Sequence, residues 1–192
     1  MTAHPDAEDD LDFTKPAKPA PPPPPEKVAS ARKEASTGSP QLQKSGFYVA
    51  MARHAGGRIP ARNGERHSVF IIEDDHALTQ LVGEVLTKAG FLTRFAKNRA
   101  EINAEFNKAP LPDLVLLDVA LPDADGFQIL ERIRSNPKIR SLPVIMMTGK
   151  SEVTDVARGL SLGADGYVTK PFKISGLVQA VNTVLGIGTQ AG

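Results

Sequence analysis

The sequence has 192 residues, a formal net charge of +1 and no cysteine. The lack of cysteine excludes a disulfide framework, a thiolate metal site and a cysteine nucleophile, and the near-neutral charge argues against nucleic-acid binding across the whole molecule. No apolar stretch approaches the roughly 20 residues that span a bilayer, and the N-terminus is acidic where a signal sequence would be basic and then apolar. We therefore expect a cytoplasmic protein that is neither exported nor inserted in a membrane.

The first 67 residues differ in composition from the rest of the chain. Ten of the sixteen prolines fall in the first 60 residues, and no apolar periodicity is sustained there. This composition predicts a disordered N-terminal extension over residues 1–67 that acts as a spacer. Bases dominate from Lys27 to Arg66, which leaves nucleic-acid binding by this tail as an alternative, but no aromatic residue interleaves with the arginines from Arg53 onward. The apolar cluster 47–51 is expected either to pack locally or to serve as a short docking motif.

From Ser68 to about Gly186, short apolar runs alternate with amphipathic stretches. The expected strands are 69–72, 92–96, 114–117, 144–147 and 167–169. The expected helices lie around 78–86, 102–106, 127–133, 153–160 and 177–185, and the second of them has the least clear pattern. Five strands alternating with five helices through right-handed crossovers predict a three-layer doubly wound α/β sandwich over residues 68–188, followed by a short tail over 189–192.

Polar side chains follow four of the expected strands. Glu73 and Asp74 follow the first strand, Asp118 the third, Thr148 the fourth and Lys170 the fifth. Because the carboxyl ends of the strands line one crevice of a doubly wound sheet, these groups are expected to converge. Three crowded carboxylates suit a hard divalent cation, especially Mg²⁺. Beside such a cation, a carboxylate on the central strand can attack phosphorus while the hydroxyl and the ammonium stabilise the transferred oxygens, which predicts aspartyl phosphorylation.

Four segments, taken together, resemble the motifs of bacterial response-regulator receiver domains in the family's order and spacing. They are Val69–Asp75 (VFIIEDD), Leu117–Gly126 (LDVALPDADG), Met147–Gly149 (MTG) and Gly166–Phe172 (GYVTKPF). The resemblance implies a flavodoxin-like (βα)5 sandwich whose parallel strands run in the order 2-1-3-4-5. It also implies a response regulator of a two-component phosphorelay, which takes a phosphoryl group from a sensor histidine kinase or a histidine phosphotransfer protein. Such a domain is not an enzyme beyond its own phosphotransfer and autodephosphorylation.

The resemblance assigns the acidic residues to phosphoryl acceptance and metal binding. Asp118 corresponds to the phosphoacceptor and is itself a metal ligand. Asp74 corresponds to a direct ligand of Mg²⁺ or Mn²⁺, and Glu73 completes the acidic pair through water or hydrogen bonds. Ala120 would offer its backbone carbonyl to the metal. The neighbouring Asp75 is expected to be only the N-cap of the first helix.

The remaining motif residues resemble the family's switching apparatus. Thr148 looks like the switch hydroxyl and Lys170 like the ammonium that contacts the phosphoryl group, with a cis peptide expected between Lys170 and Pro171. Tyr167 resembles the aromatic rotamer switch, although core packing explains an aromatic on a strand almost equally well. The downstream protein target is expected on the face made by the fourth helix, the fifth strand and the fifth helix. Gly149 stands where many members have Ala, which removes no reacting group.

Two other functions remain open from the residues. A receiver fold that acts as a phosphorylation-independent interaction module needs no reactive groups, so the intact set of Asp118, Thr148 and Lys170 argues against it. A metal-dependent phosphohydrolase that forms an aspartyl phosphate usually has a second aspartate two positions after the nucleophile, where this chain has Ala120. The chain ends soon after the fifth helix, so we expect no C-terminal effector and an output through protein binding.

Overall fold

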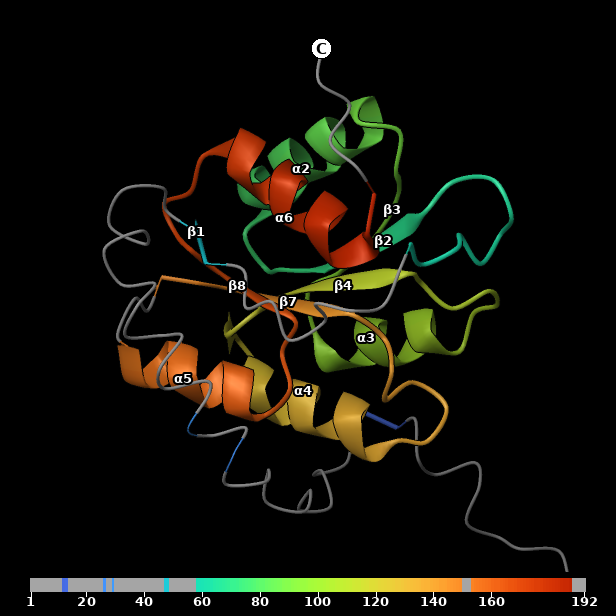
Figure 1. The fold of residues 1–192 in the computed structure, drawn as a ribbon. Coiled ribbons are helices and arrows are strands. Elements are labelled where there is room, and N and C mark those ends of the chain that lie inside the picture. The colour runs from blue at the N-terminus through green and yellow to red at the C-terminus, as the bar shows by residue number, and fades with distance from the viewer. Residues whose placement is uncertain are drawn as a thin grey trace, which may run out of the picture.

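The computed structural model describes residues 12–13, 26, 29, 47–48, 58–149 and 153–187, and its core is one sheet with helices on both faces (Figure 1). Five parallel strands form this sheet in the order β3-β2-β4-β7-β8. Their bounds are β2 Ser68–Ile72, β3 Leu92–Ala96, β4 Leu114–Asp118, β7 Val144–Thr148 and β8 Gly166–Thr169. These are the five predicted strands, and the predicted fold class and the order 2-1-3-4-5 are confirmed.

The five predicted helices divide between the two faces of the sheet (Figure 1). Helices α2 and α6 cover one face, and α3, α4 and α5 cover the other. Their bounds are α2 His76–Lys88, α3 Arg99–Phe106, α4 Gly126–Ser135, α5 Val153–Ser161 and α6 Ile174–Leu185. None of the helices in the part of the chain that the structure describes is long and apolar enough to cross a bilayer.

The continuous apolar runs become the most deeply buried strands. Every residue of β2, β4, β7 and β8 is buried, because helices cover both faces of these strands. Strand β3 lies at the free edge of the sheet and is mostly half-buried, with Phe95 exposed. The buried side chains form two apolar cores, one between the sheet and α2 with α6 and the other on the opposite face.

Helix α3 had the weakest sequence pattern, and its ends show why it forms. Asn98 is the N-cap, and its side-chain oxygen accepts from the backbone N–H of Glu101 at 2.9 Å. Glu101 in turn accepts from the backbone N–H of Lys97 at 3.0 Å, which satisfies a second free donor at the helix start. Only Ile102 and Phe106 are buried in this helix, so capping and two apolar contacts replace a broad apolar face.

Segments before Ser68 also contact the domain. Strand β1, Phe47–Tyr48, pairs antiparallel with β8 and makes the sheet six-stranded. The Ile59 N–H donates to the Leu185 carbonyl at 3.0 Å, on the face of the sheet that α2 and α6 cover. Phe13 is buried on the opposite face, in the core beneath α3, α4 and α5. Most of the predicted extension 1–67 and all of the predicted tail 189–192 lie outside the described residues, so the domain boundaries stay predictions.

Candidate metal and phosphoacceptor site

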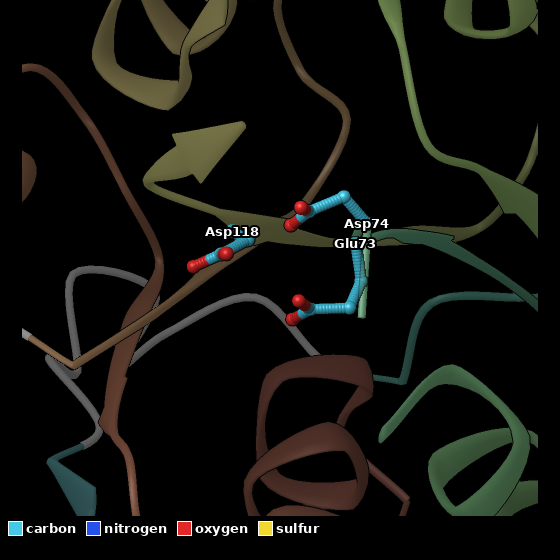
Figure 2. Close-up of side chains that lie close together, drawn as sticks. All are labelled: Glu73, Asp74 and Asp118. Atoms are coloured by element: carbon cyan, nitrogen blue, oxygen red, sulfur yellow. The ribbon is translucent and has the colours of Figure 1, made fainter. Parts of the chain in front are cut away.

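Three carboxylates gather at the carboxyl ends of the two central strands (Figure 2). One oxygen from each of Glu73, Asp74 and Asp118 lies within 4.8 Å of the others. Glu73 and Asp118 are buried, and Asp74 is exposed. The predicted convergence of the strand-end acids is therefore present in the structure.

Sheet pairing fixes where these acids lie. The Glu73 N–H donates to the Ala96 carbonyl at 3.0 Å, which extends the pairing of β2 with β3 by one residue. Asp118 is the last residue of β4 and lies in register with Met147 of β7. Asp75 then caps α2 by accepting from the Leu78 N–H at 3.1 Å, as predicted. The chain therefore turns directly from the acidic pair into a helix.

Lys170 supplies the positive charge of the site. Its Nζ lies 2.6 Å from Oε2 of Glu73 and 3.2 Å from Oδ2 of Asp118. The backbone N–H of Lys170 donates to the Thr148 carbonyl at 2.6 Å, which holds the end of β8 beside the end of β7. The peptide bond between Lys170 and Pro171 is cis, as predicted. Three acids and one ammonium leave the cluster with excess negative charge.

The ionisation of these groups reflects both burial and their mutual contacts. Burial raises the pKa of Glu73 above its usual value; the Lys170 bond opposes this shift and the Asp118 carboxylate adds to it. Burial likewise raises the pKa of Asp118, against the opposing effect of Lys170. For Lys170, burial alone would lower the pKa, but Glu73 and Asp118 together raise it. A cation is therefore the form of Lys170 that this site favours.

The donor set fits a hard divalent cation. All three side chains offer carboxylate oxygens, which Mg²⁺ and Mn²⁺ prefer over other ligands. Oδ1 of Asp118 is buried and accepts no hydrogen bond from a described side chain, although the backbone N–H groups of Ala120 and Val119 act to lower the pKa of the carboxyl. A buried carboxylate oxygen with so little hydrogen bonding is costly, and a cation beside it would reduce that cost. The residues present therefore fit a metal.

The loop after Asp118 is held close to the strand end. Ala120 begins the short strand β5, Ala120–Leu121, which pairs antiparallel with β6, Ala124–Asp125. Gly126 follows, and a Cβ at this position would overlap the Asp118 carbonyl and lie 2.8 Å from the Val119 Cα. Only glycine allows this approach, so the start of α4 is packed directly on the backbone of the candidate phosphoacceptor.

Thr148 and Tyr167 lie on neighbouring strands and are both buried. Thr148 ends β7, in register with Thr169 of β8. Tyr167 is fully buried in the core beneath α5, where its ring would lie 3.0 Å from a Cβ placed on Gly159. Burial, and then the Asp155 carboxylate, raise the pKa of the Tyr167 phenol. The ring is inside the domain in this structure.

The sequence did not indicate the contacts that support Glu73. The Asp75 N–H donates to Oε1 of Glu73 at 3.3 Å, and the Thr79 hydroxyl donates to the Glu73 carbonyl at 3.4 Å. The sequence predicts only a helix cap at Asp75, yet the backbone N–H of this residue also supports the buried Glu73 carboxylate. Backbone donors are not visible in a sequence motif, because every residue except proline carries one.

The sheet order and the acidic strand ends define a doubly wound α/β protein with a carboxylate site in the crevice of its sheet. The chain belongs to the response regulator receiver domain family, whose pattern matches residues 69–182. The predicted family is thereby confirmed.

Individual proteins support the same assignment. The chain is 37% identical over 128 residues to the transcriptional regulatory protein TrcR of Mycobacterium tuberculosis, covering 67% of this chain and 49% of TrcR. It is 35% identical over 117 residues to the phosphate regulon transcriptional regulatory protein PhoB of Escherichia coli, covering 61% and 51%. The chain thus spans about half the length of these curated relatives.

Solved structures share the fold. A putative response regulator from Chloroflexus aurantiacus superposes with a TM-score of 0.59 at 32% identity, covering 63% of this chain and 98% of that one. The chemotaxis protein CheY4 of Vibrio cholerae superposes with a TM-score of 0.58 at 26% identity, covering 62% and 98%. The shared part is the receiver fold.

Proposed function

We propose that this receiver domain accepts a phosphoryl group on Asp118 from a sensor histidine kinase or a histidine phosphotransfer protein. One observation carries the proposal. The Asp118 carboxylate lies buried at the end of a central strand, with the Lys170 ammonium 3.2 Å from Oδ2 and no described side-chain donor on Oδ1. A nucleophile needs a free oxygen, and the developing charge on phosphorus needs a nearby cation.

The other residues take roles that follow from their positions. Glu73, Asp74 and Asp118, with the Ala120 carbonyl, would hold Mg²⁺ or Mn²⁺. When bound, such a cation neutralises charge on the phosphoryl oxygens during transfer. In the transfer the phosphorus–nitrogen bond of a phosphohistidine breaks as a phosphorus–oxygen bond to Asp118 forms, and the histidine nitrogen keeps the electron pair. Lys170 then donates to a phosphoryl oxygen.

The output is proposed to be a change in protein binding. The Thr148 hydroxyl, at the end of β7, is the polar group on the strand beside β4 that would turn toward a phosphoryl oxygen on Asp118. Tyr167 lies on the next strand, beneath α5. A shift of these two residues would alter the face made by α5, β8 and α6, which are the predicted fourth helix, fifth strand and fifth helix. A downstream protein target would read that face. The cytoplasmic location stays a prediction.

Intact mass tests the proposal. Wild-type protein, Asp118→Asn and the control Asp123→Asn are incubated with acetyl phosphate, with Mg²⁺ and with a chelator. We expect the mass of one phosphoryl group on wild type and on Asp123→Asn, only with Mg²⁺, and none on Asp118→Asn. If folded wild-type protein never gains this mass from the small phosphodonor or from a phosphorylated phosphotransfer protein, the domain is a phosphorylation-independent interaction module.

A further inference from the structure

Phe13 is buried against the receiver domain although it lies in the proline-rich, acidic N-terminal part of the sequence. Its side chain is only 1% exposed. The ring stacks on Phe106, at the end of α3, with a centroid distance of 4.9 Å and an interplanar angle of 17°. Phe106 meets Phe70 of β2 edge to face at 5.3 Å. Phe13 therefore completes a row of three rings, which continues through Phe106 of α3 to Phe70 of β2.

Two arginines hold Phe13 from the receiver side. The Arg132 guanidinium, on the last turn of α4, lies over the Phe13 ring at 5.8 Å from the centroid, within the range of a cation–π contact. Nη1 of Arg99 donates to the Phe13 carbonyl at 3.2 Å. The ring and the backbone of this single residue are thus recognised separately.

Arg99 is positioned for this contact by other residues of the domain. Its Nε donates to the Asp123 carbonyl at 2.7 Å, and its Nη2 donates to Oε1 of Gln128 at 3.0 Å. A guanidinium whose other donors are already engaged loses little freedom when it binds a further carbonyl. Asp123 belongs to the loop that follows Asp118, so Arg99 connects the Phe13 segment to the loop of the candidate phosphoacceptor site.

The sequence that precedes Phe13 complements this surface in charge. Glu8, Asp9, Asp10 and Asp12 precede the ring, whereas the two side chains that recognise it are arginines. An acidic segment that ends in an aromatic ring has the chemistry that aromatic rings beside guanidinium groups bind.

We infer that the surface between α3 and α4 is a docking site for an acidic-aromatic segment, and that its occupant is this chain's own segment Asp12–Phe13, anchored by Phe13. The extension is thereby attached to the receiver domain on the face opposite α2 and α6. Phe13 lies outside the span 69–182 that matches the family, so this contact belongs to the chain's own extension.

Paramagnetic broadening in the full chain tests the inference. The chain has no cysteine, so Thr14→Cys gives one attachment site for a nitroxide, next to the anchor. We expect selective loss of amide signal at Phe106 and Arg132 and intact signals at Val181 on the opposite face. Adding Phe13→Ala should remove the selective loss, whereas the matched change Phe47→Ala, in the same extension, should leave it.

The same labelled protein distinguishes the possible occupants. If Phe13→Ala leaves the broadening unchanged, or if wild type shows none, the inference is overturned. A sample that mixes isotope-labelled chains without nitroxide and nitroxide-bearing chains without isotope reports contacts between copies. Broadening at Phe106 in that mixed sample would assign the site to a second copy and overturn docking within one chain; an undisturbed spectrum supports it. Well-dispersed amide spectra of each variant show that the domain is folded.

Discussion

Lys170 and Glu73 are 97 positions apart in the chain, yet Nζ of one lies 2.6 Å from Oε2 of the other. The pair joins the end of β8, the strand next to the edge strand β1, to the end of the central strand β2. Lys170 also reaches Asp118, so one ammonium serves two buried carboxylates. A group shared in this way matters both for the stability of the domain and for its chemistry.

Replacing Lys170 by Met should lower the stability of the metal-free protein. The change leaves Glu73 and Asp118 buried without their cation, which costs about 1–3 kcal/mol. Saturating Mg²⁺ should reduce this deficit, because the metal returns positive charge to the same carboxylates. Urea unfolding with Mg²⁺ and with a chelator measures both quantities. Lys173→Met is the control and should change neither; a Lys170→Met deficit that is equal in both buffers contradicts the argument.

Replacing Asp74 by Asn should weaken Mg²⁺ binding by about tenfold or more, since even indirect supports of a metal site have effects of that size. Asp75→Asn is a matched control one residue away. Asp75 caps α2, and Asn caps helices equally well, so this variant should keep nearly wild-type affinity. Isothermal titration calorimetry with Mg²⁺ measures the two affinities. Equal losses in both variants would mean that Asp74 is no more a ligand than its neighbour.

Replacing Glu73 by Gln should stabilise the metal-free protein at neutral pH. The pKa of Glu73 is raised in the fold, so the folded state binds this proton more readily than the unfolded state. The ionised carboxylate therefore costs stability above the raised pKa, and the cost disappears below the ordinary glutamate pKa of about 4. Glutamine resembles the protonated acid and removes the cost.

Urea unfolding in the presence of a chelator, from pH 7 downward, measures this effect. The gain of Glu73→Gln over wild type should shrink as the pH falls. Glu84→Gln on the exposed face of α2 should show no such gain. A gain that stays constant with pH would disprove the electrostatic origin, and Mg²⁺ should reverse the order of the two proteins at neutral pH.

Replacing Gly126 by Ala should destabilise the domain strongly, by about 2–4 kcal/mol, because the new Cβ would overlap the backbone of Asp118 and Val119. Backbone atoms of a buried strand end cannot move aside as a flexible side chain can. Gly149→Ala is the matched control, since a Cβ there meets nothing within 4 Å. Chemical denaturation compares the two; similar stabilities would show that the loop relaxes freely.

Replacing Tyr48 by Pro should expose the outer edge of β8. Strand β1 pairs through Phe47 with Val168 and through Tyr48 with Tyr167, and proline removes a backbone donor from so short a strand. Hydrogen–deuterium exchange followed by mass spectrometry should then speed up in the segment 166–169. Exchange in 114–118, which lies in the middle of the sheet, should stay at the wild-type rate. Unchanged exchange in 166–169 would mean that β1 does not protect this edge.

Much of the domain was predictable from local pattern. The continuous apolar runs of β2, β4 and β7 identified strands covered on both faces, because only such strands have no polar alternation. The repeats of α2, with Asp75 before it and Gly90 after it, marked a helix with both its ends. Polar residues after four strands indicated a shared crevice, since parallel strands end at the same edge of a sheet.

The order of the strands was predictable only from the resemblance to the family's motifs, because no local sequence pattern indicates which strand lies beside which. The weak apolar face of α3 likewise did not define where this helix begins, which the Asn98 cap fixes in the structure. The strand order depends on which segments pair in space, and the start of α3 depends on a hydrogen bond to the backbone. Apolar periodicity indicates neither of these.

Contacts between distant segments were decided only by the tertiary structure. Phe13 lies among prolines and acids and has no apolar periodicity around it, so its burial depends on residues far along the chain, such as Phe106 and Arg132. The pairing of β1 with β8 and the bond of Lys170 to Glu73 are of the same kind. A sequence records which side chains can bury a ring or hold a charge, but their distances exist only once the folded sheet and helices bring them together.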